Sequence, residues 1–282
     1  MKYRVLPHGI EVQTSCFDLG ETLSCGQCFR WDELGPGSWR GIVSGRSVIA
    51  RQSGDTLLLE GASLADFEEV WRPYFDLDRD YNALRQEMSG HPVLAPVVAF
   101  APGIHILAQP AWEALCSFLI SQNNNIPRIR SIVSRLCADF GDPLPGGLFA
   151  FPTPEALACV TLEQLSPLRC GYRAPYLIDA ARKVADGQLD LEKISRLPLE
   201  EAREELRTVK GVGPKVAECV LLYGMGRMDA FPADVWIKRT MGVLFPQGLP
   251  SRFAHCAGLT QQYIYHWSRC GPGREILQEH SS

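Results

Sequence analysis

The sequence contains no apolar run of the ~18 residues that a membrane-spanning helix requires. Its first residues, MKYRVLP, lack the apolar core of a secretory signal, and repeats and low-complexity tracts are absent as well. With 282 residues, of which 46% are hydrophobic, the chain can bury a sizeable core in one large domain or two ordinary ones. We therefore expect an intracellular protein without a membrane partner, in the cytoplasm and nucleoid if its source is bacterial.

The sequence also lacks the excess of basic residues that is typical of nucleic-acid-binding proteins, since its formal net charge is -4 and its pI is about 5.9. This acidity is unevenly distributed. Residues 1–104 carry 9 basic and 14 acidic side chains, whereas residues 105–282 carry 19 and 18. Any DNA binding must therefore rely on locally placed arginines and backbone N–H groups, and its salt dependence should be moderate.

The ten cysteines are spread along the chain and do not form the dense framework of a small disulfide-rich protein. Only Cys25 and Cys28 form a close C-x-x-C pair. A redox or zinc site there would need a thioredoxin-like context or a second pair, so these remain minor alternatives. We expect reduced thiols and no metal site.

The N-terminal third combines strand and helix signals. Residues 39–61 predict three short antiparallel strands, because apolar residues recur between turn signals at positions 44–45 and 53–54. Ser63 begins a near capping box for a helix that ends at about Phe75, and a further short helix is expected over residues 80–88. Three prolines at positions 92, 96 and 102 break regular structure and indicate a domain junction.

Beyond the junction the pattern is helical throughout, most clearly over residues 126–140, where apolar residues recur at helical spacing. Helices are predicted at residues 112–121, 126–140, 154–160, 175–185, 199–206, 214–223, 234–244 and 259–268. The expected fold class is α+β, with an N-terminal antiparallel β-sheet domain with helices (residues 1–98) followed by an all-α domain (residues 99–282).

Residues 206–219 (LRTVKGVGPKVAEC) hold the most informative pattern in the chain. A helical run ends at Leu206, Gly211 and Gly213 supply a tight reversal, and Pro214 fits the first position of the next helix. This is a helix-hairpin-helix. Its free backbone N–H groups and the positive end of its second helix favour an anionic group such as a phosphate of the DNA backbone.

The hairpin, Lys215 and Asp234 together resemble the lyase-type branch of the helix-hairpin-helix DNA glycosylases, over most of the chain. Four further segments resemble the 8-oxoguanine DNA glycosylases in particular: residues 24–31 (SCGQCFRW), 122–128 (QNNNIPR), 171–174 (GYRA) and 261–265 (QQYIY). The C-terminal four-cysteine cluster of the iron-sulfur relatives is missing, with Cys256 and Cys270 standing alone there.

The resemblance implies a helix-hairpin-helix glycosylase domain and a bifunctional glycosylase and AP lyase in base excision repair. Such an enzyme removes 8-oxoguanine, and ring-opened purines, from duplex DNA opposite cytosine and cleaves the strand by β-elimination. It implies a monomer whose partner is double-stranded DNA containing oxidised guanine. No cofactor is required, although a structural monovalent cation held by the hairpin carbonyls is compatible with the family.

Substitution at C1′ of a nucleotide requires a nucleophile and a negative charge that stabilises the developing positive charge on the sugar. Lys215, in the first turn of its helix, supplies the amine in this interpretation. Asp234 corresponds to the essential aspartate of the family, and its position at a helix start also predicts a structural N-cap. The Lys215 amine can then form a Schiff base with the opened sugar.

The resemblance assigns four residues to the damaged base. Gly26 supplies a backbone carbonyl for the N7 proton that 8-oxoguanine carries and guanine lacks, and Gln261 reads the Watson–Crick edge. Cys219 and Tyr265 sandwich the ring, with tyrosine here in place of the family's usual phenylalanine. Taken alone, Gly26 would be a turn glycine and Cys219 a buried apolar thiol.

A second set would contact the DNA around the extruded base. Tyr172 resembles the wedge, Asn123 the residue that fills the vacated space, and Arg128 and Arg173 the pair that holds the orphan cytosine through its N3 and O2 acceptors. Gly211, Gly213 and Trp236 would contact the backbone. The last is a departure, since eukaryotic relatives have a histidine at that position.

Two rival functions remain from the sequence. One is a glycosylase-lyase of the same fold that acts on oxidised pyrimidines, which would not need the pocket of Gly26, Gln261 and Tyr265. The other is a non-catalytic helix-hairpin-helix module that binds DNA, which would not need Lys215 and Asp234 together.

Overall fold

The computed structural model describes residues 1–275 and begins with an antiparallel sheet of six strands. The spatial order is β1-β2-β6-β5-β4-β3. The strands are β1 (Lys2–Leu6), β2 (Gly9–Gln13), β3 (Trp31–Gly35), β4 (Ser38–Val43), β5 (Arg46–Ser53) and β6 (Thr56–Glu60). The predicted three-stranded meander is confirmed as β4, β5 and β6. The sheet is wider than predicted, because β1 and β2 extend it beyond β6, and β3 pairs with β4.

One face of the sheet packs on a continuous helical segment that begins at the predicted capping box. Ser63 accepts from the N–H of Asp66, and the Asp66 carboxylate accepts from the N–H of Ser63. The segment runs through α2 (Leu64–Asp66), the π-helical turn η1 (Phe67–Trp71) and α3 (Arg72–Tyr74). Its aromatic side chains share a core with the sheet, where the Trp31 indole N–H donates to the Tyr74 hydroxyl at 2.8 Å.

The rest of the described chain is predominantly helical, which confirms the α+β class. The first helices are α1 (Leu19–Ser24), α4 (Tyr81–Ser89), α5 (Ala95–Phe100), α6 (Ala111–Ser121), α7 (Ile126–Phe140), α8 (Pro154–Ala158) and α9 (Leu162–Leu165). They are followed by α10 (Ala174–Ala185), α11 (Leu191–Ser195), α12 (Leu199–Arg207), α13 (Pro214–Met225), α14 (Val235–Leu244) and α15 (Ala257–Cys270). The eight helices predicted beyond the junction are all present.

Two expectations about regular structure were wrong. The prolines near the junction do not abolish helix, since α5 forms with Pro96 in its first turn, where a missing N–H removes no helical hydrogen bond. The region beyond the junction is also not helical throughout. A small hairpin of β7 (Pro143–Leu144) and β8 (Leu148–Phe149) follows α7, with Gly146 and Gly147 at positive φ in its turn.

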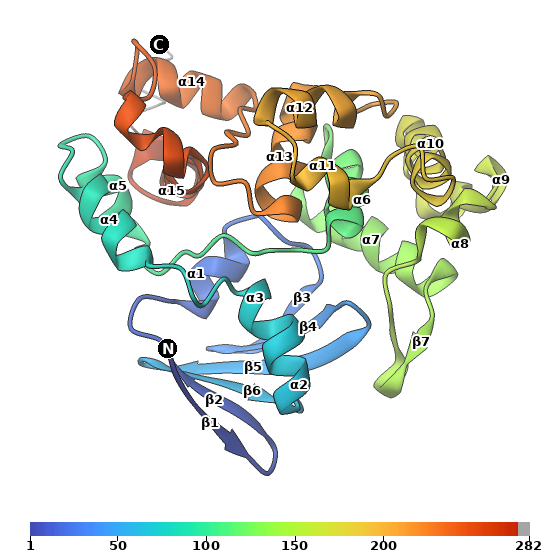
Figure 1. Cartoon of the computed structure of the whole chain (residues 1–282), viewed down its shortest axis with the longest axis horizontal. Helices are drawn as coiled ribbons and strands as arrows, with labels where there is room; N and C mark the ends of the chain where they lie inside the picture. Colours follow the sequence, from blue (N-terminus) through green and yellow to red (C-terminus); the bar gives the residue numbers. More distant parts are fainter. Residues whose placement is uncertain (276–282) are drawn as a thin grey trace.

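A second and larger core holds the helical part together, with α6 and α13 packed against each other at its centre. Buried residues of α4 and α5 also belong to this core. Figure 1 shows the sheet with α2 and α3 on one side, most of the other helices on the opposite side, and α1 where the two parts meet. No helix within residues 1–275 is long and apolar enough to cross a membrane. The division between residues 98 and 99 stays a prediction, and residues 276–282 of the second predicted domain lie outside the described residues.

Candidate active site

The predicted helix-hairpin-helix consists of α12, a hairpin around residues 208–213, and α13. Gly211 has φ +80°, and a Cβ on it would lie 2.2 Å from the ring of Tyr176 in α10, so a side chain is excluded. Gly213 is the N-cap of α13, followed by Pro214 in the first turn, as predicted. Within the described residues the N–H groups of Gly211 and Gly213 donate to no protein acceptor. Together with the start of α13 they provide a place for an anion.

Lys215 lies in the first turn of α13 and points toward α6. Its Nζ donates to the Ser121 hydroxyl at 3.4 Å and lies 5.3 Å from the centroid of the Phe118 ring. The side chain is half-buried. The amine thus contacts an apolar ring and the Ser121 hydroxyl and interacts with the Cys219 thiol, without a carboxylate in ion-pair contact among the described residues.

Asp234 caps α14, as the sequence predicted. Its Oδ1 accepts from the backbone N–H of Ile237 at 2.7 Å, and the side chain is half-buried. The cap fixes the carboxylate relative to α14. Its action on a sugar stays a prediction.

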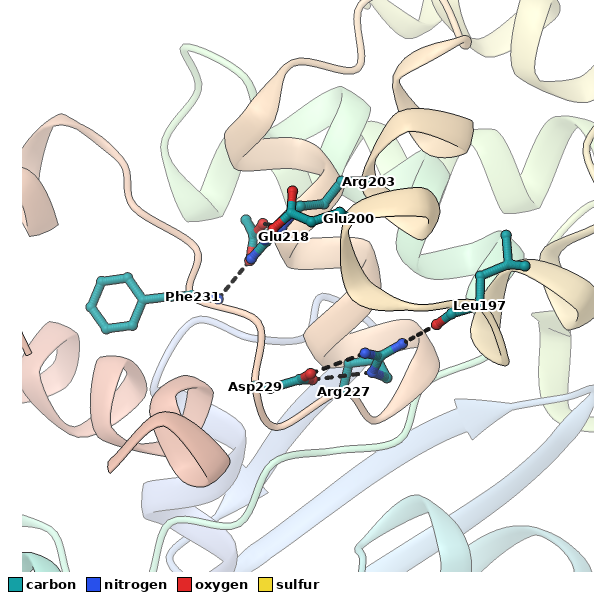
Figure 2. A network of polar contacts seen from close by, with 7 residues as sticks. All are labelled: Leu197, Glu200, Arg203, Glu218, Arg227, Asp229 and Phe231. Carbon is teal, nitrogen blue, oxygen red and sulfur yellow. Dashed lines mark hydrogen bonds and ion pairs between the residues drawn. The ribbon is translucent and has the colours of Figure 1, made fainter. Parts of the chain in front are cut away.

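The loop between α13 and α14, which ends at Asp234, is tied to the preceding helices by the polar network in Figure 2. The Glu218 carboxylate on α13 accepts from the backbone N–H of Phe231 at 2.6 Å and from Arg203 Nε of α12 at 2.5 Å. A second ion pair in the loop, between Arg227 and Asp229, has distances of 3.1 and 3.0 Å. Glu218 therefore connects the helix of Lys215 to the loop that carries Asp234.

The four residues assigned to the damaged base come from three parts of the chain. Gly26 follows α1 with φ +88°, and a Cβ on it would lie 3.5 Å from the Tyr265 ring of α15. Burial raises the pKa of Tyr265, and the charge of Arg269 opposes this effect. Cys219 is buried one turn after Lys215 on α13. Burial raises the pKa of its thiol, against the opposing effect of the Lys215 charge.

Gln261 has an unusual environment. Its side chain is only 3% exposed, and the Oε1 atom is buried with no hydrogen-bond partner in the described part of the chain. An unpaired buried acceptor costs ~1–3 kcal/mol. A ligand that brings an N–H group to this oxygen would remove that cost.

Four of the residues assigned to the surrounding DNA, namely Asn123, Arg128, Tyr172 and Arg173, meet at an open cleft of about 630 Å³, whereas Gly211, Gly213 and Trp236 do not line it. The Tyr172 ring is 53% exposed, and Asn123 stands at φ +52° in the turn between α6 and α7. Arg128 is also exposed on the first turn of α7. The cleft is lined by Asn123, Asn124, Asn125, Arg128, Tyr172, Arg173 and Arg269.

Arg173 differs from Arg128 in its contacts. It is 5% exposed and donates to the carbonyls of Gln122 at 2.7 Å, Cys170 at 3.1 Å and Asn123 at 3.3 Å. These bonds support the turn that presents Asn123. A contact between Arg173 and an orphan base stays a prediction, and it requires the guanidinium to leave some of these carbonyls.

Trp236 also uses its donor internally, because the indole N–H donates to Ser268 Oγ at 2.8 Å. A cation beside this indole is Arg269, which lines the open cleft and whose guanidinium lies 5.3 Å from the Trp236 ring and 5.7 Å from the Tyr265 ring. Sequence reasoning missed both Arg269 and Ser121. A basic residue in the last turn of a helix gives no sign by itself that it lines a cleft.

The C-x-x-C pair is not arranged for redox chemistry. Both thiols are buried, and burial raises the pKa of Cys25 to about 12 and that of Cys28 as well. Their sulfurs interact with the carbonyls of Thr22 and Leu23 at 3.2 and 3.7 Å. Among residues 1–275 no three His, Cys, Asp or Glu side chains form a metal-binding group. The monovalent cation at the hairpin stays a prediction.

The chain is similar to known base excision repair proteins in sequence and in fold. Residues 9–115 match the family model of the 8-oxoguanine DNA glycosylase N-terminal domain, and residues 116–248 match the HhH-GPD superfamily of base excision DNA repair proteins. The N-glycosylase/DNA lyase of Saccharomyces cerevisiae is 33% identical over 78% of this chain and 66% of its own length. The chain spans 52 to 66% of the lengths of this and two other curated relatives.

Two solved structures are similar over nearly their whole lengths. MBOgg1 in complex with a low-affinity DNA ligand is 41% identical, with a TM-score of 0.90 over 98% of this chain and 99% of that one. The 8-oxoguanine glycosylase/lyase of Clostridium acetobutylicum, in complex with DNA containing cytosine opposite 8-oxoG, is 33% identical, with a TM-score of 0.89 over 95% and 98%.

Proposed function

The chain belongs to the 8-oxoguanine DNA glycosylases of the helix-hairpin-helix superfamily, and we propose that it removes 8-oxoguanine from duplex DNA and then cleaves the strand. One observation carries the proposal. The Lys215 amine, in the first turn of the hairpin's second helix, contacts the Ser121 hydroxyl and the Phe118 ring and has no carboxylate in ion-pair contact in the described part of the chain. We expect the pocket for the damaged base to lie beside it, between Gly26, Cys219, Gln261 and Tyr265.

In the proposed reaction the damaged nucleotide leaves the stack and enters this pocket. The Lys215 amine forms a bond to C1′, the bond between C1′ and N9 breaks, and its electron pair leaves with the base. The Asp234 carboxylate stabilises the positive charge that develops on the sugar. After the amine loses a proton the sugar opens to a Schiff base. Loss of a C2′ proton then expels the 3′-phosphate, which is the lyase step.

Recognition of the damaged base rests on the free carbonyl of Gly26. In 8-oxoguanine N7 carries a proton and can donate to this oxygen, whereas guanine presents a lone pair there. Cys219 and Tyr265 would contact the two faces of the ring, and Gln261 would accept from its Watson–Crick edge. The same contacts would accept ring-opened purines.

Outside the pocket, Tyr172 would enter the stack, Asn123 would fill the space left by the base, and Arg128 with Arg173 would hold the orphan cytosine. Gly211 and Gly213 would bind a backbone phosphate through their N–H groups. Arg269 takes the phosphate contact for which the Trp236 indole has no free donor. The enzyme would act as an intracellular monomer without a required cofactor.

The test is single-turnover excision from three duplexes, which contain 8-oxoguanine, an oxidised pyrimidine or an undamaged guanine opposite the appropriate partner. The proposal predicts base release from the first duplex only. Release of the oxidised pyrimidine at an equal or higher rate would favour the rival glycosylase. Tight binding without any base release would favour the non-catalytic module.

A further inference from the structure

The carbonyls on either side of Gly26 are both held by glutamine side chains. The Cys25 carbonyl accepts from Gln262 Nε2 at 2.9 Å, and the Gln27 carbonyl accepts from Gln109 Nε2 at 2.7 Å. Within residues 1–275 the Gly26 carbonyl itself accepts no hydrogen bond from the protein. The turn is thus fixed at its two neighbours, and the central carbonyl is left for a ligand.

Gln262 is suited to this fixing role because both ends of its amide are engaged. It is 1% exposed on α15, and its Oε1 accepts from the Tyr223 hydroxyl of α13 at 2.5 Å. Burial raises the pKa of Tyr223 well above its ordinary value, so the phenol stays a donor. The amide therefore connects α13, which carries Lys215 and Cys219, with α15 and with the turn of Gly26.

Gly26 needs such external support. Its φ of +88° lies in the region that glycine occupies freely, and without a Cβ the residue has little resistance of its own to rotation of the adjoining peptide planes. A change in either plane would turn the Gly26 carbonyl away from the ring position beside Tyr265.

We propose that Gln262 is a positioning residue for lesion recognition: by holding the Cys25 carbonyl, it aims the free Gly26 carbonyl at the N7 proton of the damaged base. Gln262 does not contact the base in this arrangement. The inference rests on the proposed function, and it adds a residue on which discrimination between damaged and undamaged guanine depends.

The test compares two substrates of the same enzyme. Gln262→Met keeps the length of the side chain but removes both hydrogen bonds. It should slow single-turnover excision of 8-oxoguanine about ten- to a hundredfold, the usual effect of losing a well-placed base contact. Cleavage at a preformed abasic site, which needs Lys215 but no base recognition, should stay within about twofold of wild type.

Binding gives a second readout. In a Lys215→Gln background, Gln262→Met should reduce the ratio of affinities for 8-oxoguanine and guanine duplexes about tenfold or more. Tyr263→Phe is the matched control, because it removes a partly buried hydrogen bond from the same helix to the Pro102 carbonyl at 3.1 Å, away from the Gly26 turn. Tyr263→Phe should leave the ratio of affinities unchanged, and also the ratio of the rate of 8-oxoguanine excision to the rate of abasic-site cleavage, even where it lowers the melting temperature.

An unchanged ratio of affinities in Gln262→Met overturns the inference. An equal loss of rate on the 8-oxoguanine duplex and at the abasic site also overturns it, because such a loss indicates a merely structural role. If Gln262→Met does not fold, Tyr223→Phe replaces it. This variant frees only the Oε1 end of the amide and should show a smaller loss of the same pattern, and an unchanged ratio there also overturns the inference. Failure of the wild-type enzyme to release 8-oxoguanine would instead refute the proposed function.

Discussion

Replacing Glu218 by alanine should slow base excision by more than its effect on folding stability explains. The substitution leaves the N–H of Phe231 without its acceptor, which costs ~1–3 kcal/mol. The side chain of Arg203 is 26% exposed and keeps Glu200 as a partner, so losing the ion pair between Arg203 and Glu218 adds little to this cost. We expect a loss of ~2 kcal/mol in the free energy of unfolding, and a fall in Tm of ~4–8 °C. Asp234 lies three residues after Phe231, and a displacement of ~1 Å at a catalytic group can cost ~10²-fold in rate.

The assay is single-turnover excision of 8-oxoguanine, together with thermal unfolding and DNA affinity. The matched control is Arg203→Met, which disrupts the same ion pair but keeps the bond between Glu218 and Phe231. Glu218→Ala should reduce the rate ~10–100-fold with unchanged affinity. Arg203→Met should be close to wild type in rate, although it also lowers Tm because it leaves the Glu218 carboxylate, whose side chain is 12% exposed, without its cation. If the excision rate falls in the same proportion to the loss of Tm in both variants, the positioning role of Glu218 is refuted.

Three further variants test other parts of the site. Asp234→Asn keeps a capping oxygen but loses the charge, so it should bind lesion DNA and excise ~10²–10³-fold more slowly, and normal single-turnover kinetics would leave Asp234 only a structural cap. Arg128→Ala should reduce the preference for cytosine over adenine opposite the lesion by ~1–2 orders of magnitude, measured with all four partner bases. Equal wild-type rates for the four partners would contradict the orphan-base assignment, which Arg173 shares. Arg269→Ala should weaken binding to damaged and undamaged duplexes alike and lower the salt slope by ~1, and an unchanged slope would remove Arg269 from the DNA surface.

Local signals in the sequence predicted much of this molecule. The capping box at Ser63, the cap at Asp234 and the hairpin before Pro214 each depend on residues within a few positions of one another, and the structure contains all three. The strand β2 was missed although Ile10 and Val12 alternate with polar residues, because five residues give a weak period.

The contacts that the sequence could not predict join distant parts of the chain. Gln262 and Cys25 are 237 positions apart, and no pattern in either segment indicates that they meet. Likewise, the bond from Glu218 to Phe231 depends on the path of a loop, and the cleft position of Arg269 depends on how α15 packs. Such contacts are set by tertiary packing, whereas caps and periodicity are set by neighbours in the sequence.

Borohydride trapping tests the central claim most directly, because it requires a Schiff base between this chain and the sugar of the damaged nucleotide. Wild-type protein incubated with a duplex containing 8-oxoguanine opposite cytosine should form a covalent complex, and Lys215→Gln should form none while still binding the duplex. A trapped complex with Lys215→Gln, or no complex with wild type under conditions in which it binds the lesion, would contradict the account.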